Sequence, residues 1–262
     1  MKSSYWQSQT KQKPLFPDLE WSRPENKLHA GKLLVVGGNA HGFAAPAGAF
    51  GYTQTAGAGT VHALLPDAVR KIVDAILPEA DYAPSTPSGS LSQKALVDLL
   101  QAGNWADSVL VAGDLGRNSE TAILLESFLA KHRGQVTITK DAVDYITSSP
   151  LTILQREDTL LVLSLSQLQR LGTAAKLPKP VKFSMDLLHL VEWLHECTTR
   201  HQPHIIVKHQ NALLAAVNGQ VSSTTVGDTK DLWRVKTAAI ASVWWMQHTN
   251  KPFEAITASL LA

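Results

Sequence analysis

The sequence predicts an α/β fold with a mostly parallel central sheet that is covered by helices on both faces. Short apolar runs alternate with amphipathic stretches along most of the 262 residues, a pattern typical of successive βαβ units. Two of these runs, residues 32–36 and 108–112, end in glycine-containing loops that lead into a helix. Because open α/β sheets bind ligands at the carboxyl ends of their strands, these loops are the first place to look for a functional site.

The segment 31–61 has the clearest βαβ pattern. An apolar strand, residues 32–36, stops at Gly37-Gly38, where the backbone must approach another group closely. Residues 44–58 are small and predict a helix that packs close to the sheet or to a ligand, before a second strand over residues 60–65. A turn that only closes the strand onto the helix explains the glycine pair as well.

The remaining elements follow the same alternation. The predicted helices cover residues 66–77, 91–100, 119–131, 187–194, 232–247 and 252–261, and the further strands cover 136–139, 159–163, 205–208 and 212–217. Capping patterns begin helices at Asp67, at Asn118 and at Ser166 with Gln169. The Asn218-Gly219 pair predicts an antiparallel hairpin, followed by a polar loop over residues 222–231.

The chain is expected to form one domain over residues 23–262, preceded by an N-terminal arm over residues 1–22. The arm is polar and contains Pro14 and Pro17, so we expect it to be irregular. Its aromatic residues Trp6, Phe16 and Trp21 indicate that it packs against the domain or against a partner subunit.

Composition excludes several classes of protein. The net charge is +2 and the basic residues do not cluster, which argues against nucleic-acid or membrane-surface partners. A single cysteine, Cys197, excludes an internal disulfide and a cysteine-based zinc site. The N-terminus lacks the apolar segment of a secretory signal, and the apolar run 238–246 is too short to span a bilayer. We therefore expect a soluble cytoplasmic protein, and the histidine spacing predicts no protein-bound metal.

Several segments, taken in order, resemble one known family. Residues 30–39 are similar to its opening strand and GGS loop, and residues 44–59 to its small-residue helix that ends in AGAG. Residues 113–117 resemble its GPGLGR loop, residues 139–143 its DADAL segment, and residues 207–209 its LKG strand. The chain thereby resembles the ADP/ATP-dependent NAD(P)H-hydrate dehydratases, ribokinase-like enzymes that dehydrate damaged nicotinamide nucleotides at the expense of a nucleoside phosphate.

This resemblance implies a three-layer ribokinase-like fold and two binding regions. The residues that would contact a nicotinamide-nucleotide substrate are Gly38, Asn39, His41, Asp114, Gly116, Arg117 and Asp141. The residues of the LKG-like strand that would contact ADP or ATP are Lys208 and His209. Arg234 and Lys236 are cations at a helix start, where a bound phosphate would explain them, although both could simply face water. The resemblance further implies a homo-oligomer, and any magnesium would enter only with a bound nucleotide.

The departures from the family pattern concern its catalytic machinery. The family has a GSGD segment before its PFEA segment, which is present here as residues 252–255. The aligned residues are Trp233-Arg234-Val235-Lys236, which lack both glycines and the catalytic Asp, so Lys236 stands at the family's Asp position. Bulky and β-branched residues cannot form the glycine nest that cradles a phosphate. Around residues 164–167, the histidine and glutamate of the family's TPHxGE motif are also missing.

These observations lead to three hypotheses. The first is a divergent family member that keeps a nucleotide or dinucleotide cleft but lacks the family's catalytic groups. The second is an active NAD(P)H-hydrate dehydratase, a lyase, or a small-molecule kinase with relocated groups, in which Asp228 or Asp231 serves as the base. Either aspartate could instead cap the long helix that follows. The third is a non-catalytic interaction protein whose cleft has closed.

Other candidate residues also have ordinary structural explanations. Asp114 could bind ribose hydroxyls or could stabilise its own turn, as aspartates often do. Lys140 and Asp141 could pair with each other, and Lys208 could extend into solvent. His41 could be a surface histidine without a ligand.

Overall fold

A mostly parallel sheet forms the middle of the molecule. The computed structural model describes residues 4–74, 76–77, 79–147, 149–226 and 233–262. Within these residues, ten strands lie in the order β1-β10-β9-β8-β7-β6-β5-β2-β3-β4. Their bounds are β1 Trp6–Gln9, β2 Lys32–Gly37, β3 Thr60–Pro66, β4 Ala80–Ala83, β5 Ser108–Gly113, β6 Gln135–Thr139, β7 Thr159–Leu163, β8 His204–His209, β9 Ala212–Val217 and β10 Gln220–Thr225. Neighbours are parallel except β8 with β9 and β9 with β10, which confirms the predicted sheet.

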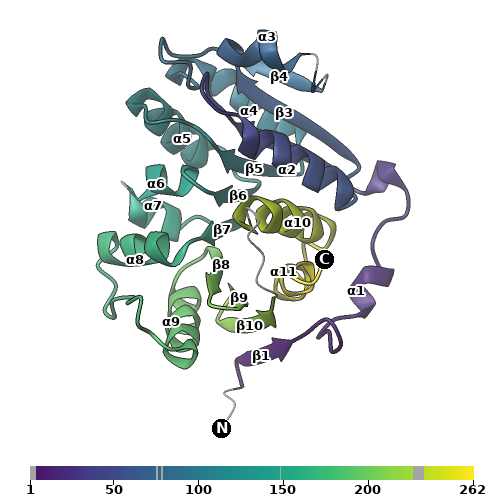
Figure 1. Ribbon diagram of the computed structural model, residues 1–262, viewed down its shortest axis with the longest axis vertical. Coiled ribbons are helices and arrows are strands. Elements are labelled where there is room, and N and C mark those ends of the chain that lie inside the picture. The colour runs from purple at the N-terminus through teal and green to yellow at the C-terminus, as the bar shows by residue number, and fades with distance from the viewer. Residues whose placement is uncertain (1–3, 75, 78, 148, 227–232) are drawn as a thin grey trace.

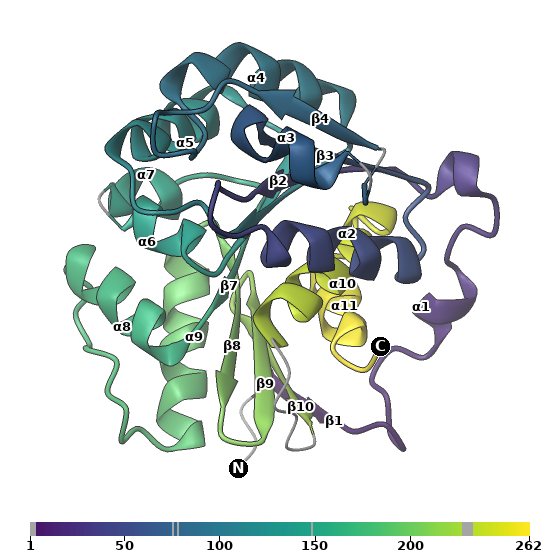
Figure 2. The same ribbon diagram turned by 45° about the horizontal axis from the view of Figure 1, so that its top comes forward.

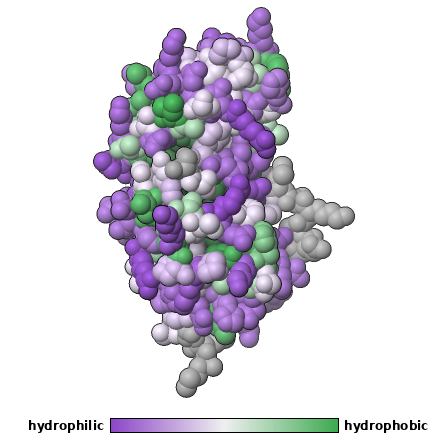
Figure 3. All heavy atoms as spheres, turned by 90° about the vertical axis from the view of Figure 1, so that its left-hand side faces the viewer, coloured by the Kyte–Doolittle hydropathy of each residue, from purple (hydrophilic) through white to green (hydrophobic). Residues whose placement is uncertain are grey.

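Helices cover both faces of this sheet and make a three-layer fold (Figures 1 and 2). Their bounds are α1 Asp18–Trp21, α2 Ala44–Thr55, α3 Arg70–Val73, α4 Leu96–Trp105, α5 Ser119–Lys131, α6 Ala142–Ile146, α7 Pro150–Leu154, α8 Leu165–Ala174, α9 Leu187–Arg200, α10 Trp233–Gln247 and α11 Pro252–Ser259. Helices α2, α10 and α11 pack on one face, while α4 to α9 lie on the other. The outer surface of that second layer is mostly hydrophilic, as expected for helices that bury one side only (Figure 3).

The central strands are apolar throughout because both of their faces are buried. Along β2, Leu33 and Val35 point into the core beneath α2 and α10, whereas Leu34 and Val36 point into the core beneath α4 and α5. All four side chains are at most 1% exposed. Successive strand residues point to opposite faces, so a strand between two helical layers reads as a continuous apolar run.

Helix α10 is the central helix of its layer. It contacts α2, α11 and strands β5 to β7, and its Trp244 and Trp245 are 4% and 1% exposed. The tryptophan pair therefore belongs to the core. Among the described residues, no helix is both long enough and apolar enough to cross a membrane.

The predicted hairpin is confirmed. Strands β9 and β10 pair antiparallel, and Asn218 and Gly219 connect them with φ values of 48° and 80°. Two consecutive positive φ values are the geometry that an Asn-Gly pair favours, because this turn matches the twist of the strands. The strand continues to Thr225, however, so the expectation of a polar loop from residue 222 is wrong over its first four residues.

The N-terminal segment is not irregular as expected. Strand β1 joins the edge of the sheet by pairing parallel with β10, and α1 follows it. The Trp6 indole donates to Ser223 Oγ at 3.1 Å, whereas Trp21 is 88% exposed. The sequence did not indicate this strand because its pairing partner lies more than two hundred residues away.

Several local predictions differ from the structure. The helix expected over residues 91–100 begins at Leu96 and ends at Trp105, and the one expected over 187–194 continues to Arg200. The helix expected over residues 66–77 is short, because α3 ends at Val73 within the described part of the segment. Asp67 does not cap it, because its carboxylate accepts hydrogen bonds from Ser85 of the following loop. The capping box is formed by Ser164 and Gln167, two residues earlier than predicted.

Candidate functional site

The loops after β2 and β5 approach each other closely at the carboxyl edge of the sheet. Gly38 N donates to Gly113 O at 3.0 Å, and a Cβ at Gly37 would collide with the same carbonyl oxygen. Gly113 has φ 102°, a conformation that side chains disfavour. The two predicted glycine loops are therefore neighbours, because β2 and β5 are adjacent parallel strands and their carboxyl ends lie at the same edge of the sheet.

Asp114 is the centre of a set of polar contacts at this edge. Its carboxylate accepts from Lys140 Nζ at 2.6 Å and from the backbone N–H of Ala45, in the first turn of α2, at 2.7 Å. Its carbonyl oxygen accepts from Asn39 Nδ2 at 2.5 Å. The aspartate thereby occupies the N-terminus of α2, which would otherwise favour an external anion.

Asp141 holds the neighbouring loop in place. Its two carboxylate oxygens accept from the backbone N–H groups of Asp114, at 2.7 Å, and Leu115, at 2.9 Å. The alternative in which Lys140 pairs with Asp141 is therefore wrong, because Lys140 pairs with Asp114. The unusual φ of Lys140, 53°, accompanies this arrangement.

Gln167 and Arg234 extend the same network to the start of α10. The Gln167 side chain, 3% exposed, donates to Lys140 O at 2.6 Å and accepts from Arg234 at 2.9 Å. Sequence reasoning did not choose Gln167 as a site residue, although its spacing from Ser164 is a capping signal. We call the residues Asn39, Asp114, Lys140, Asp141, Gln167 and Arg234 the edge cluster.

The other predicted substrate residues lie around the edge cluster. His41 and Arg117 are exposed, and the backbone N–H of His41 donates to Asn39 Oδ1 at 2.8 Å. Gly116 accepts a hydrogen bond from the Tyr145 hydroxyl and has φ 75°. The structure thus brings the predicted substrate residues together at one edge, with their carboxylates bonded to groups of the protein itself.

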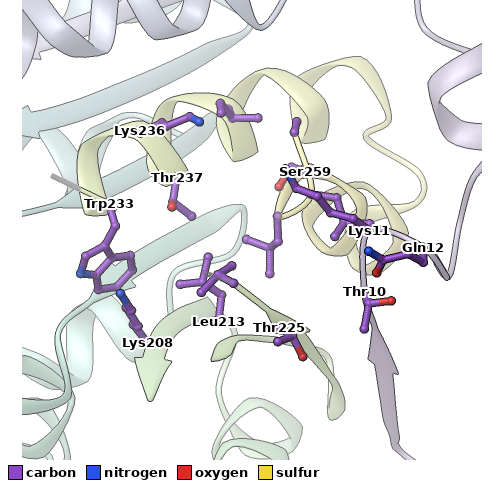
Figure 4. Close-up of a pocket in the computed structure, with 15 residues that line it drawn as sticks. Thr10, Lys11, Gln12, Lys208, Leu213, Thr225, Trp233, Lys236, Thr237 and Ser259 are labelled. Carbon is purple, nitrogen blue, oxygen red and sulfur yellow. The ribbon is translucent and has the colours of Figure 1, made fainter. Parts of the chain in front are cut away.

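A separate cavity of about 390 Å³ lies between the β9–β10 hairpin and the C-terminal helices (Figure 4). We call it the hairpin pocket. Its described lining residues are Thr10, Lys11, Gln12, Lys208, Leu213, Thr225, Val226, Trp233, Lys236, Thr237, Ile240, Ser259, Leu260, Leu261 and Ala262. The Trp233 indole lies beside Lys208 at one end, and Lys11 and Gln12 lie at the other (Figure 4). The pocket therefore combines an apolar floor with three lysines.

The four predicted nucleotide-contacting residues are divided between different places. Lys208 and Lys236 line the hairpin pocket, whereas Arg234 belongs to the edge cluster. Residues two positions apart point about 200° apart around a helix, which explains why Arg234 and Lys236 face different regions. His209 lies outside the pocket lining, where it is buried and bonds to Met185 O at 2.9 Å.

The candidate catalytic residues Asp228 and Asp231 lie outside the described residues. Among the residues that the structure does describe, no group of three or more histidine, cysteine, aspartate or glutamate side chains could hold a metal ion. Sequence reasoning did not single out Lys11 or Gln12, because nothing near them in the sequence indicates that β1 brings them beside α10.

Three buried titratable groups with shifted pKa values, His204, His132 and Cys197, lie away from both regions. Burial lowers the pKa of His204, the first residue of β8, to about 4. Burial, followed by the charge of Arg156, lowers the pKa of His132 at the end of α5 to about 4. Burial also raises the pKa of the Cys197 thiol to about 12, so this cysteine is not a nucleophile at neutral pH.

Comparison with solved structures identifies the fold as ribokinase-like. A ribokinase-like superfamily protein from Enterococcus faecalis V583 matches with a TM-score of 0.75 and 17% identity, over 100% of this chain and 87% of that chain. The ADP/ATP-dependent NAD(P)H-hydrate dehydratase from Bacillus subtilis, co-crystallised with ATP and Mg²⁺, matches with a TM-score of 0.61 and 14% identity, over 90% of this chain and 79% of that chain. At such identities the likeness establishes the fold alone. Neither the protein-family models nor the curated proteins contain a match to this sequence.

Proposed function

We propose that this protein is a divergent NAD(P)H-hydrate dehydratase-like protein that binds a nucleotide or dinucleotide in the hairpin pocket and does not catalyse the dehydration. The observation that carries the proposal is the convergence of Trp233, Lys208 and Lys236 on one cavity of about 390 Å³. Ligand pockets typically measure roughly 300–1,000 Å³, so a nucleotide could enter it at least in part.

The chemistry of the pocket suits a nucleotide. The Trp233 indole offers a flat apolar surface for a base, while Leu213 and Ile240 contribute further apolar lining. Lys208 and Lys236 would attract phosphate groups as point charges. This arrangement would replace the glycine nest that the sequence lacks at the start of α10.

Residues at the start of α10 and in the edge cluster support the proposed loss of catalysis. Lys236 stands where the family has its catalytic Asp, and Val235, 2% exposed, is packed into the core. The carboxylates of Asp114 and Asp141 already accept charge-assisted or backbone hydrogen bonds. A carboxylate used in this way is a poor general base, because both of its oxygens already accept hydrogen bonds that favour the unprotonated form.

An active enzyme is the second candidate. Asp228 and Asp231 lie five and two positions before Trp233, which lines the pocket, so either carboxylate is close in sequence to the proposed ligand. With one of them as base, the protein would be a nucleotide-dependent NAD(P)H-hydrate dehydratase or a small-molecule kinase, with magnesium brought in by the nucleotide.

A binding panel followed by an activity assay tests these alternatives. The panel consists of ATP, ADP, NADH, NADPH and the hydrated forms of the last two, measured by calorimetry and by thermal shift. A ligand at 100 times its dissociation constant adds about 2.7 kcal/mol to the free energy of unfolding. Binding without dehydration supports the proposal, whereas turnover that is lost in Asp228→Asn or Asp231→Asn establishes the enzyme. No binding by any member of the panel favours a non-catalytic interaction protein.

We also propose that the protein forms a homo-oligomer. Trp21 and Leu28 are each 88% exposed, and a partner copy could cover them. Light scattering on the wild type and on Trp21→Ser measures this directly. A monomeric mass for the wild type at high micromolar concentration would reject the proposal.

A further inference from the structure

We infer that residues 10–12 of the N-terminal turn form a fixed wall of the hairpin pocket and that Lys11 is a binding residue for a ligand with several negative charges. The inference rests on the proposed function, because it concerns the same pocket. The inference goes beyond the proposed function by assigning a role to the N-terminal segment and by specifying a polyphosphate as the part of the ligand that this segment contacts.

The turn itself is tightly closed. Thr10 N donates to Lys13 O at 3.2 Å, and Lys13 N donates back to Thr10 O at 3.0 Å. Lys13 N is also 3.2 Å from Thr10 Oγ1. These bonds leave Lys11 and Gln12 at the tip, and both of these residues line the pocket.

The residue before the turn anchors it to two other walls of the pocket. Gln9 is 2% exposed and pairs with Thr224 in the β1–β10 register. Its Nε2 donates to Thr224 Oγ1 at 2.8 Å and to Thr257 O, in α11, at 2.6 Å. Its Oε1 accepts from Leu15 N, on the far side of the turn, at 3.3 Å. Because one buried side chain joins β10, α11 and the end of the turn, the position of Lys11 is set by the fold.

Three lysines from distant parts of the sequence thus line one cavity. Lys11 comes from the N-terminal turn, Lys208 from the carboxyl end of β8 and Lys236 from the first turn of α10 (Figure 4). Among the described lining residues, no side chain is acidic. None of the three forms an ion pair with a described residue, so the cavity carries a positive field that attracts a multiply charged anion. With Trp233 at the opposite end, the ligand would extend from a base at the indole to phosphates near Lys11.

The turn provides its own matched control. Lys13 carries the same charge in the same turn and is exposed, but it does not line the pocket. We compare the wild type, Lys11→Met and Lys13→Met by calorimetry with three probes: sodium tripolyphosphate, ATP and adenosine. Thermal unfolding without ligand shows whether either substitution affects folding.

Lys11→Met is expected to weaken the binding of tripolyphosphate and ATP about 5- to 10-fold, in line with the loss of one charge-assisted contact. Lys13→Met should change either affinity less than about 2-fold, because it alters only the long-range field. Adenosine binding should be the same in all three proteins.

The possible outcomes distinguish a failure of this inference from a failure of the proposed function. If ATP binds and both lysine variants behave alike, Lys11 is not a binding residue and the inference fails while the nucleotide pocket stands. If tripolyphosphate binding depends on Lys11 but ATP binds no better than tripolyphosphate, the inference holds and nucleotide recognition fails. If the wild type binds none of the three probes, both are wrong.

Discussion

The edge cluster and the hairpin pocket use similar residue types for different purposes. In the edge cluster, Asp114 and Lys140 pair at 2.6 Å and Asp141 bonds two backbone N–H groups, so each carboxylate has partners within the protein. In the hairpin pocket, Lys208 and Lys236 form no ion pair with a described residue. Charged residues near a strand end therefore indicate a ligand only when no group of the protein itself pairs with them.

This contrast predicts that changes in the edge cluster alter stability, while changes in the hairpin pocket alter ligand binding. The largest change in stability should come from two buried histidines that lie outside both regions. The pKa values of His132 and His204 are lowered to about 4 in the folded protein, against an ordinary value near 6.5.

Lowering the pH from 7 to 5 should decrease the free energy of unfolding by roughly 3 kcal/mol. Below pH 6.5 the unfolded imidazoles take up protons and the buried ones do not, so the free energy of unfolding decreases as the pH falls, until the pH nears 4. Urea unfolding at several pH values measures the slope, and His204→Leu should flatten it. A slope that is unchanged in this variant would show that His204 is not held neutral in the folded protein.

Asp141→Ala should decrease the free energy of unfolding by about 2–3 kcal/mol, because it leaves two backbone N–H groups without their carboxylate. Chemical unfolding at pH 7 measures the loss. The control is Asp81→Ala, whose side chain is 69% exposed and which should change stability by less than about 0.5 kcal/mol. Equal effects in the two variants would mean that the edge cluster does not hold the loops together.

Arg234 and Lys236 offer the sharpest comparison, because they belong to the same helix and to different regions. Arg234→Met should lower stability by about 1 kcal/mol through the lost bond to Gln167 and should leave ATP affinity unchanged. Lys236→Met should leave stability within about 0.5 kcal/mol and weaken ATP binding several-fold. Unfolding and calorimetry on the two purified variants give all four values. Weaker ATP binding in Arg234→Met than in Lys236→Met would move the ligand to the edge cluster.

Local sequence patterns predicted the features that depend only on neighbouring residues, such as helix caps and tight turns. Asn118 caps α5 as expected, with its side chain accepting from Glu120 N at 2.8 Å, and Asn218-Gly219 closes the predicted hairpin. The sequence also placed Gly37 and Gly113 in loops at the carboxyl ends of two strands, and the observed pairing of β2 with β5 makes those loops neighbours.

The rest depends on contacts between distant segments. Gln9 bonds Thr224, 215 residues away, and this pairing is what carries Lys11 to the pocket. Lys140 has a positive φ and pairs with Asp114 of the loop after β5, and no pattern around residue 140 predicts either feature. The sequence analysis placed Arg234 and Lys236 at one nucleotide site, and no pattern around them indicates that only Lys236 meets the cavity.

We propose that a nucleotide binds in the hairpin pocket and not at the edge cluster. The most direct test is amide hydrogen exchange of the wild type with and without saturating ATP, resolved to short peptides. We expect ATP to slow exchange in residues 10–13 and in the first turn of α10, with no change in residues 38–45 and 113–118. Protection confined to residues 38–45 and 113–118, or none at all, would contradict the claim.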